Sequence, residues 1–336
     1  MGRNLLQPST RAFIREARRT PGYSLFDWLH GYVYARWPYL YIGIGTGEHP
    51  LARVVGPLVR GLSRLFPSKP GDDPSVTLAD TYHGKVVPLA AAQRLVTVNQ
   101  EISLTNLEHV IPYTRARDII LHNPDHIVVL KCPCRTARPN PCRPLDVCLI
   151  VGEPFAGFVA EHHPDRSRWI MPEEAVAILR AEHERGHVHH AFFKDAMLGR
   201  FYAICNCCAC CCGAMQAWQN GVPMLASSGY VSHVDEDRCI GCGDCADFCQ
   251  FGALTVSDSL ALVDSATCMG CGVCVSHCAQ SALSLVRDPA KGEPLEIREL
   301  IALSVRGREQ RADGIGQVED VPDAKVNLIG RACRRG

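Results

Sequence analysis

Two runs of cysteines in the last third of the chain have the same spacing, C-x2-C-x2-C-x3-C. The two runs comprise Cys239, Cys242, Cys245, Cys249, Cys268, Cys271, Cys274 and Cys278. Three thiolates spaced by two residues can wrap one face of an iron–sulfur cube, while the fourth, three residues on, points away from it. Chance or a disulfide framework explains this double pattern poorly, so the spacing predicts iron–sulfur ligation.

Over residues 230–290, this double run resembles the ligand run of bacterial two-cluster ferredoxins. The resemblance implies two [4Fe–4S] clusters, with each fourth cysteine binding the other cluster. The implied ligands are Cys239, Cys242, Cys245 and Cys278 for one cluster, and Cys268, Cys271, Cys274 and Cys249 for the other. Ferredoxins usually have proline after the fourth cysteine, whereas this chain has Gln250 and Ala279, which keep a backbone N–H.

A second group of cysteines occupies the stretch 132–148. It comprises Cys132, Cys134, Cys142 and Cys148. Prolines stiffen this stretch, and its arginines could offset the charge of thiolates. Four thiols suit one metal centre, so we expect an additional cluster here; buried free thiols are the alternative.

The densest group of cysteines comprises Cys205, Cys207, Cys208, Cys210, Cys211 and Cys212. Two C-x2-C registers interleave in this group, and neighbouring side chains diverge, so all six thiols cannot easily serve one site. We therefore expect at least one further cluster, either within this group or shared with the stretch 132–148. A shared site would follow if segments 127–130 and 201–204 were neighbouring strands.

Length and composition limit the classes of protein. The 336 residues suggest about two domains. The net charge is zero, with 35 basic and 35 acidic residues, which argues against a general nucleic-acid binder. Nineteen cysteines at metal-like spacings favour a reducing, anaerobic cytoplasm. We expect neither a secretory signal nor a transmembrane helix, because the sequence has no suitable apolar run.

The pattern of the chain predicts an α+β protein. Residues 1–219 form a predicted cysteine-rich mixed α/β domain, 230–290 the ferredoxin-type domain, and 291–336 a helix and a mobile tail. Cys333 in this tail is not expected to be a ligand. The clearest elements are helices over 9–19 (with Ser9 as N-cap), 172–186 and 294–305, a buried strand over 126–131 and a strand pair over 254–264.

Weaker signals predict further elements. A capping-box pattern at 105–108 predicts the start of a helix, and a second helical stretch is predicted near 113–122. Residues 39–44 resemble a buried strand, and residues 66–80 a loop rich in Pro, Ser, Gly and Asp.

Eight aromatic residues gather in residues 23–45. We interpret this stretch as an aromatic core, since large aromatic side chains dominate cores. A docking face for a redox partner and a contact with a membrane surface are the alternatives. His187, His189 and His190 are expected to be core or solvated histidines, with metal binding or proton transfer as the alternative.

The stretch 131–148, followed by a helix and the stretch 205–212, resembles a group of poorly characterised iron–sulfur proteins with a C-terminal ferredoxin module. The resemblance implies a joined electron-transfer chain. We therefore predict a protein that passes single electrons through two [4Fe–4S] clusters, and one or two further clusters, to or from a partner oxidoreductase or flavoprotein. No catalytic residue is predicted.

Two other functions stay open. One is a multi-cluster reductase with its own substrate or cofactor site in the N-terminal domain, as in epoxyqueuosine reductases and reductive dehalogenases. The chain, however, has no corrinoid motif D-x-H-x-x-G and no phosphate-binding glycine loop. The other is a non-catalytic cluster carrier.

Charge distinguishes the two ferredoxin-type runs. Acidic residues flank the first run: Asp235, Glu236, Asp237, Asp244 and Asp247. The second run is nearly neutral and contains His277. Because negative charge opposes the addition of an electron, we expect the cluster of the first run to have the lower reduction potential.

Overall fold

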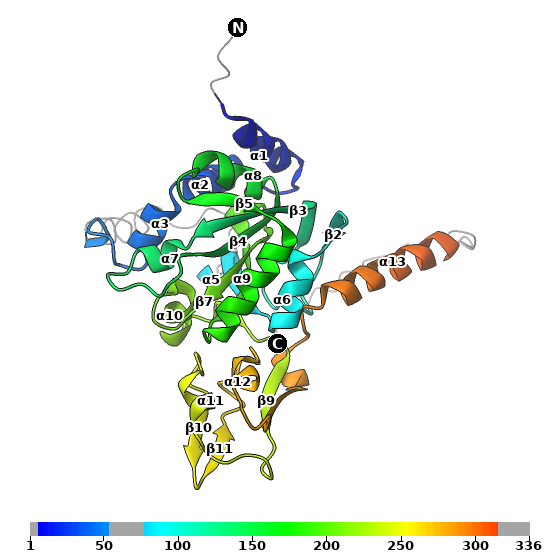
Figure 1. Cartoon of the computed structure of the whole chain (residues 1–336). Helices are drawn as coiled ribbons and strands as arrows, with labels where there is room; N and C mark the ends of the chain where they lie inside the picture. Colours follow the sequence, from blue (N-terminus) through cyan, green and yellow to red (C-terminus); the bar gives the residue numbers. More distant parts are fainter. Residues whose placement is uncertain (1–5, 54–76, 315–336) are drawn as a thin grey trace, which may run out of the picture.

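The computed structural model describes residues 6–53 and 77–314. The chain has a large part built on an eight-stranded sheet and a small part with two two-stranded sheets, which lies below the large part in Figure 1. The fold is therefore of the mixed α+β class, as predicted.

Three helices open the chain: α1 (Pro8–Arg19), α2 (Leu25–Arg36) and α3 (Pro38–Gly45). Helix α1 agrees with the predicted helix, although Gln7 rather than Ser9 is its N-cap. Helix α2 begins at a capping box, in which Ser24 and Asp27 each accept the backbone N–H of the other. The strand predicted over 39–44 is wrong, because Pro38 occupies the first turn of α3, where its fixed φ favours a helix.

The large sheet has the strand order β2-β3-β4-β7-β6-β1-β8, and β5 also pairs with β3. Its strands are β1 (Tyr82–Val86), β2 (Ile102–Leu104), β3 (Ile119–Lys131), β4 (Asp146–Glu153), β5 (Ser167–Ile170), β6 (Val188–Lys194), β7 (Arg200–Cys207) and β8 (Leu225–Ala226). The ladders are antiparallel except for the pair β1 and β8. Because β4 lies between β3 and β7, segments 127–130 and 201–204 are not direct neighbours.

Two predicted helices are wrong. Residues 105–117 form turns and bends, and β3 begins at Ile119 and includes the predicted strand 126–131. Pro112 lacks the N–H that a helix interior needs. The alternating buried residues Ile119 and Leu121 instead fit a strand paired with β2.

Further helices of the large part are α5 (Leu78–Thr81), α6 (Leu89–Val96), α7 (Pro133–Thr136), α8 (Phe155–His162), α9 (Pro172–Glu184), η1 (Asp195–Met197) and α10 (Gly213–Gln219). Helix α9 agrees with the predicted helix: Pro172 is in its first turn, and Gly186 follows its end with φ +82°. Of the predicted loop 66–80, residues 66–76 lie outside the described residues, and α5 forms near its end.

Each face of the large sheet contributes to its own core. Along β3, Ile127 and Val129 belong to the core that contains α6 and α9, while Val128 and Leu130 belong to the other. This alternation follows from the two-residue period of a strand. The second core lies beneath α1, α2 and α8 and also contains buried cysteines of the stretches 132–148 and 205–212.

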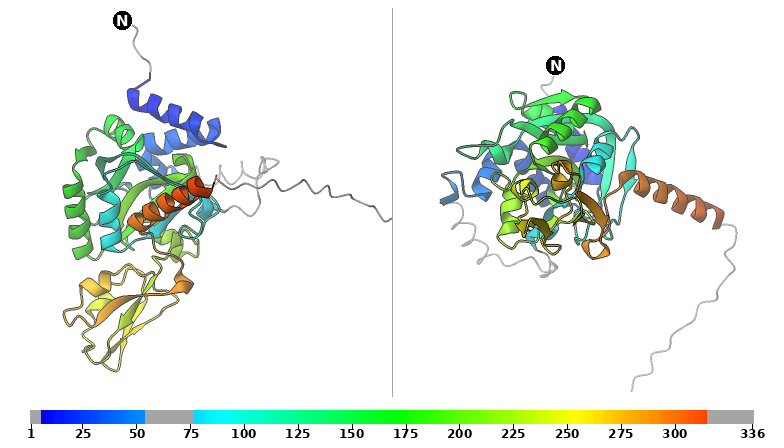
Figure 2. Two further views of the ribbon diagram at one scale, coloured as in Figure 1. Left: turned by 90° about the vertical axis from the view of Figure 1, so that its right-hand side faces the viewer. Right: turned by 60° about the horizontal axis from the view of Figure 1, so that its bottom comes forward.

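The small part comprises β9 (Tyr230–Val234), α11 (Asp244–Asp247), β10 (Leu254–Ser257), β11 (Leu260–Val263), α12 (Val273–Ser276), β12 (Leu283–Arg287) and η2 (Pro289–Lys291). The hairpin of β10 and β11 confirms the predicted strand pair. Helix α13 (Ile297–Gly314) confirms the predicted helix but is longer, and Figure 2 shows it projecting from the body. The tail beyond residue 314 lies outside the described residues.

The aromatic stretch 23–45 is mainly core. Six of its eight aromatic residues belong to or pack against the core beneath α1, α2 and α8: Tyr23, Trp28, Tyr32, Tyr34, Tyr39 and Tyr41. Phe26 and Trp37 are exposed. Among the described helices, none combines the length and the apolar character needed to cross a membrane.

A close approach of α2 to η1 generates a prediction about stability. A Cβ added at Gly31 would overlap the carbonyl oxygen of Ala196, whereas one at Gly45 would meet no atom of the described residues within 4 Å. We expect Gly31→Ala to lower the free energy of unfolding by about 1–3 kcal/mol, because backbone must move to make room. Gly45→Ala is the matched control and should change it by less than about 0.5 kcal/mol. Equal denaturation midpoints of the two variants would contradict this packing.

Candidate iron–sulfur and metal centres

The small part contains two cavities of about 20 Å³, each lined by four cysteines. The first cavity is lined by Cys239, Cys242, Cys245 and Cys278, and the second by Cys249, Cys268, Cys271 and Cys274. The structure thus brings the fourth cysteine of each run to the other run, in the same grouping that the ferredoxin resemblance implies.

Two glycines with the same geometry shape these cavities. Gly241 and Gly270 each have φ +64°, and a Cβ at either position would overlap the backbone of Ser259 or Tyr230, respectively. Only glycine allows the cysteine loops to approach these backbones so closely. The matching positions in the two runs give the small part an internal repeat.

Backbone amides point at sulfur atoms in both cavities. The N–H···S distances are 3.2 Å from Ala253 to Cys249, 3.2 Å from Ala282 to Cys278, 3.4 Å from Ala261 to Cys239 and 3.5 Å from Ser232 to Cys268. Such donors stabilise negative charge on cluster ligands and help to set the reduction potential. The chemistry and placement of these groups therefore fit a thiolate-bound iron–sulfur cube in each cavity.

The large part contains a cavity of about 80 Å³ that we call the chamber. Six thiols form a chain along its wall: Cys205, Cys148, Cys132, Cys134, Cys212 and Cys207. They come from β4, the end of β7 and the residues at the N-terminal ends of α7 and α10. Three tyrosines also line the chamber: Tyr34, Tyr82 and Tyr202.

Neighbouring thiols of the chamber shift one another's pKa. Hydrogen bonds with Cys134 and Cys148, together with burial, raise the pKa of Cys132. A hydrogen bond with Cys212, aided by nearby His190, lowers the pKa of Cys207 to about 6 despite burial. Six thiolates in this one largely buried space would repel one another strongly unless cations neutralised them. The donor set of the chamber therefore fits a metal cluster, which supplies that positive charge.

A buried ion pair supports the wall of the chamber. Arg135 and Glu182 are 2.5 Å apart and each side chain is only 1% exposed. Although burial disfavours the charged form, Glu182 raises the pKa of Arg135 above its ordinary value. Arg135 also donates to the carbonyl oxygens of Pro144 at 2.6 Å and Asn206 at 2.9 Å, so it joins the segments that carry the cysteines.

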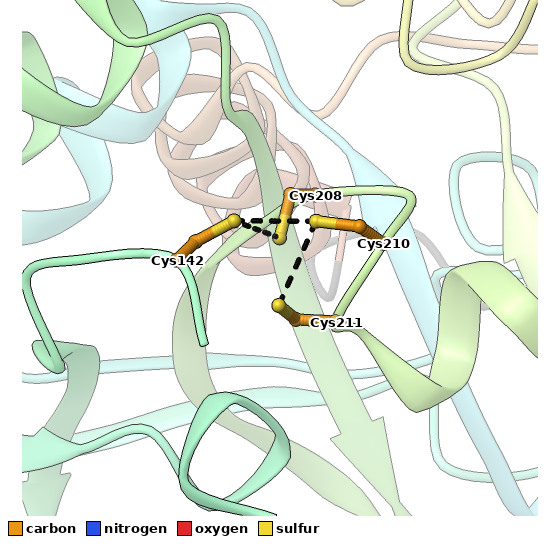
Figure 3. A group of neighbouring side chains, drawn as sticks. All are labelled: Cys142, Cys208, Cys210 and Cys211. Carbon is orange, nitrogen blue, oxygen red and sulfur yellow. Dashed lines mark hydrogen bonds between the residues drawn. The ribbon is translucent and has the colours of Figure 1, made fainter. Parts of the chain in front are cut away.

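A separate group of four thiols lies beside the chamber, and we call it the tetrathiol site. It consists of Cys142, Cys208, Cys210 and Cys211 (Figure 3), whose sulfur atoms all lie within 4.8 Å of one another. The sulfur of Cys142 is 3.2 Å from that of Cys210 and 3.7 Å from that of Cys208. Cys208 and Cys211 also line the chamber.

The structure mixes the two upstream groups of cysteines rather than keeping each group together. The thiol of Cys142 lies with three cysteines from the turn after β7. The other three cysteines of the stretch 132–148 lie in the chamber with Cys205, Cys207 and Cys212. The expectation of one centre within 132–148 therefore does not match the geometry, and the alternative of shared sites does. The mixing arises because β4 and β7 are paired.

A continuous core joins the chamber to the second small cavity. Phe251 and Met269, which line that cavity, belong to the same core as Cys207 and Cys212. His190 lies against Cys207, and its ring centroid is 6.5 Å from that of Phe251. His190 is fully buried, and its contact with Cys207 lowers the pKa of that thiol.

Sequence reasoning did not identify the chamber tyrosines as parts of a site. It expected the arginines of the stretch 132–148 to offset thiolate charge, and it gave metal binding or proton transfer as the alternative for His190. Arg135 supports the chamber wall, and His190 lies against Cys207. Sequence reasoning also noted Gln250, where ferredoxins usually have proline. The Gln250 side-chain oxygen accepts the backbone N–H of Ala209 at 2.8 Å, which joins the end of the first run to the turn after β7. The departure from the ferredoxin pattern was thus a signal of contact between the two parts.

The three predicted histidines are core residues, as expected. His187 pairs with Glu182 at 2.7 Å, and His189 with Asn206 at 2.6 Å. His183, the second-last residue of α9, contacts the hydroxyl of Ser276 at 2.7 Å and stacks on His189. These contacts help to hold the small part against the large part.

Comparison with known families agrees with the first ferredoxin-type run. The 4Fe-4S binding domain family matches residues 232–255. None of the curated proteins matches the chain. The family match indicates at least one [4Fe–4S] cluster and an iron–sulfur electron-transfer role.

The contact of Gln250 with Ala209 generates a prediction. In Gln250→Ala, we expect the amide hydrogen of Ala209 to exchange with solvent up to about ten times faster, because it loses its acceptor. Hydrogen–deuterium exchange of anaerobic protein measures this rate. Gln280→Ala removes an exposed glutamine of the second run and should leave the exchange unchanged. Equal protection of Ala209 in all three proteins would show that this contact does not join the parts.

Proposed function

We propose that this chain is an electron-transfer protein that passes single electrons between a partner oxidoreductase or flavoprotein and the chamber, through two [4Fe–4S] clusters. The proposed ligands are Cys239, Cys242, Cys245 and Cys278 for one cluster, and Cys268, Cys271, Cys274 and Cys249 for the other. The observation that carries this proposal is the pair of four-cysteine cavities with amides directed at sulfur. A bound cube spreads one electron over iron and sulfide, so little geometry changes on reduction.

The chamber is the proposed site of a further cluster, held by its six thiols. Two observations support it: the donor set of six cysteines, and a volume of about 80 Å³ against about 20 Å³ for each small cavity. Arg135 would help to neutralise the remaining thiolate charge and keep the wall in place.

The order of the cavities suggests a route for electrons. Cys242 and Ile240 beside the first cavity are exposed, which offers a partner protein close access. The second cavity lies toward the chamber, and Phe251 and His190 fill the space between them. We therefore propose that electrons enter or leave at the first cavity and reach the chamber through the second. We propose that residues 1–219 form the domain that contains the chamber and that residues 230–290 form the ferredoxin-type domain. Residues 291–336 follow as a helix and a tail.

A reductase is the second candidate function. The phenol groups of Tyr34 and Tyr202 are 2.8 Å apart on the chamber wall and could bind a small molecule beside a cluster. Steady consumption of electrons from a chemical donor, dependent on a small-molecule acceptor and independent of a partner protein, would favour the reductase. The proposed place of action for either function is a reducing, anaerobic cytoplasm.

Metal content tests the electron-transfer proposal. Anaerobically purified protein should contain about eight irons and eight sulfides for the two small cavities, and more if the chamber is filled. Cys134→Ser should lower the content toward eight of each and leave the ferredoxin-type electron paramagnetic resonance signals intact. Cys333→Ser removes a cysteine not assigned to any site and is the matched control. Colourless protein without iron would contradict the proposal.

Charge beside the first cavity generates a prediction about reduction potential. Asp244 and Asp247 lie on α11, which carries Cys245 of that cavity. Replacing both with Asn should raise the potential of the first cluster, because less negative charge opposes the electron. The second cluster should change less, and Glu299→Gln on α13 should change neither. Redox titration followed by electron paramagnetic resonance measures both potentials; a higher potential at the first cavity than at the second in the unmodified protein would contradict the predicted order.

A further inference from the structure

The spacing of sulfur atoms distinguishes the tetrathiol site from the other cysteine groups. Its sulfur atoms lie within 4.8 Å of one another, and three of the pairs are 3.2, 3.6 and 3.7 Å apart. Across residues 6–53 and 77–314, no other group of three or more cysteines has all its sulfur atoms within 4.8 Å of one another. The sets of cysteines that line the two small cavities do not meet this limit.

This spacing matches ligands that share one ion. Metal–sulfur bonds of about 2.3 Å in a tetrahedron place the ligand sulfurs about 3.8 Å apart. A cube places each thiolate on a different iron, so its ligand sulfurs lie further apart than those around one ion. We propose that Cys142, Cys208, Cys210 and Cys211 hold a single thiophilic metal ion, zinc or iron, rather than an iron–sulfur cube.

The location of the four cysteines indicates what such an ion would do. Cys142 lies between α7 and β4, whereas the other three lie in the turn between β7 and α10. The ion would therefore join two segments that are far apart in the sequence. Because Cys208 and Cys211 also line the chamber, the ion would fix part of the chamber wall. A site with four protein ligands leaves no open position, which is typical of a structural centre.

A neighbouring arginine reinforces the same junction. Arg138, just after α7, donates from Nε to the carbonyl oxygen of Cys211 at 3.3 Å and also contacts the Gln216 side chain on α10. Its guanidinium forms an ion pair with Glu48. The two segments are thus already held in register around the four thiols, which lowers the entropic cost of binding the ion.

The solvent exposure of two of the thiols also favours binding of an ion at this site. Cys210 is exposed and Cys142 is half-buried, so an ion could enter from solvent. The proposed ion requires neither a particular direction of electron flow nor the proposed cluster in the chamber.

Metal and sulfide analysis of Cys210→Ser tests the inference. Cys210 does not line the chamber, so the chamber thiols stay in place. The variant should lose about one zinc or one iron per chain and no sulfide. Loss of about four irons together with four sulfides would indicate a cube and overturn the inference, as would loss of no metal. Cys134→Ser is the control, because it alters the chamber and should retain the ion.

Elemental analysis distinguishes zinc from iron, and a ferric tetrathiolate has its own electron paramagnetic resonance signal.

A second measurement does not depend on whether the variant folds. Unmodified protein produced with cobalt should show the visible absorption of tetrahedral cobalt bound by four thiolates, with about one such ion per chain. Absence of that absorption at full cobalt supply would overturn the inference. The electron paramagnetic resonance signals of the ferredoxin-type clusters report separately on the proposed function.

Discussion

Repulsion between crowded thiolates is the constraint on which this molecule depends. Eighteen cysteines fall within the described residues, and every one of them lies in one of four groups, each of which shares one small space. Deprotonated sulfur atoms at such distances destabilise a fold unless positive charge lies between them. Metal ions would supply most of this positive charge. The backbone amides directed at sulfur and the guanidinium of buried Arg135 add to it. The arrangement of cysteines is therefore best explained by the metal groups that we propose they hold.

The large sheet provides the rigid frame for this arrangement. One face packs against an ordinary apolar core with α6 and α9, while the other core contains the sulfur atoms of the chamber. Strand β7 places Cys205 and Cys207 on the same side because they are two residues apart. The chain then turns, so the next cysteines reach the tetrathiol site. A short sequence rich in cysteine thus serves two sites because the strand ends inside it.

The cysteine spacing and the resemblance that it carries were sufficient to predict the grouping of cysteines in the small part but not in the large one. The spacing around Cys239 and Cys268 resembles that of two-cluster ferredoxins, and this resemblance implied the two sets of four cysteines that line the small cavities. The grouping in the large part depends on β4 lying between β3 and β7, which no local pattern encodes. The same limit explains the false helix near 113–122, where pairing with β2 outweighs local preference. Helix α9, with Pro172 and Gly186 at its ends, needed no such information.

Anomalous X-ray diffraction from a crystal grown without oxygen, with data collected on both sides of the iron absorption edge, tests most directly whether these cysteines hold iron. We expect strong iron density in each of the two small cavities and in the chamber, next to the cysteines that line them. If iron density were missing from both small cavities, or if zinc replaced it there, the chain would not be the iron–sulfur electron-transfer protein that we propose.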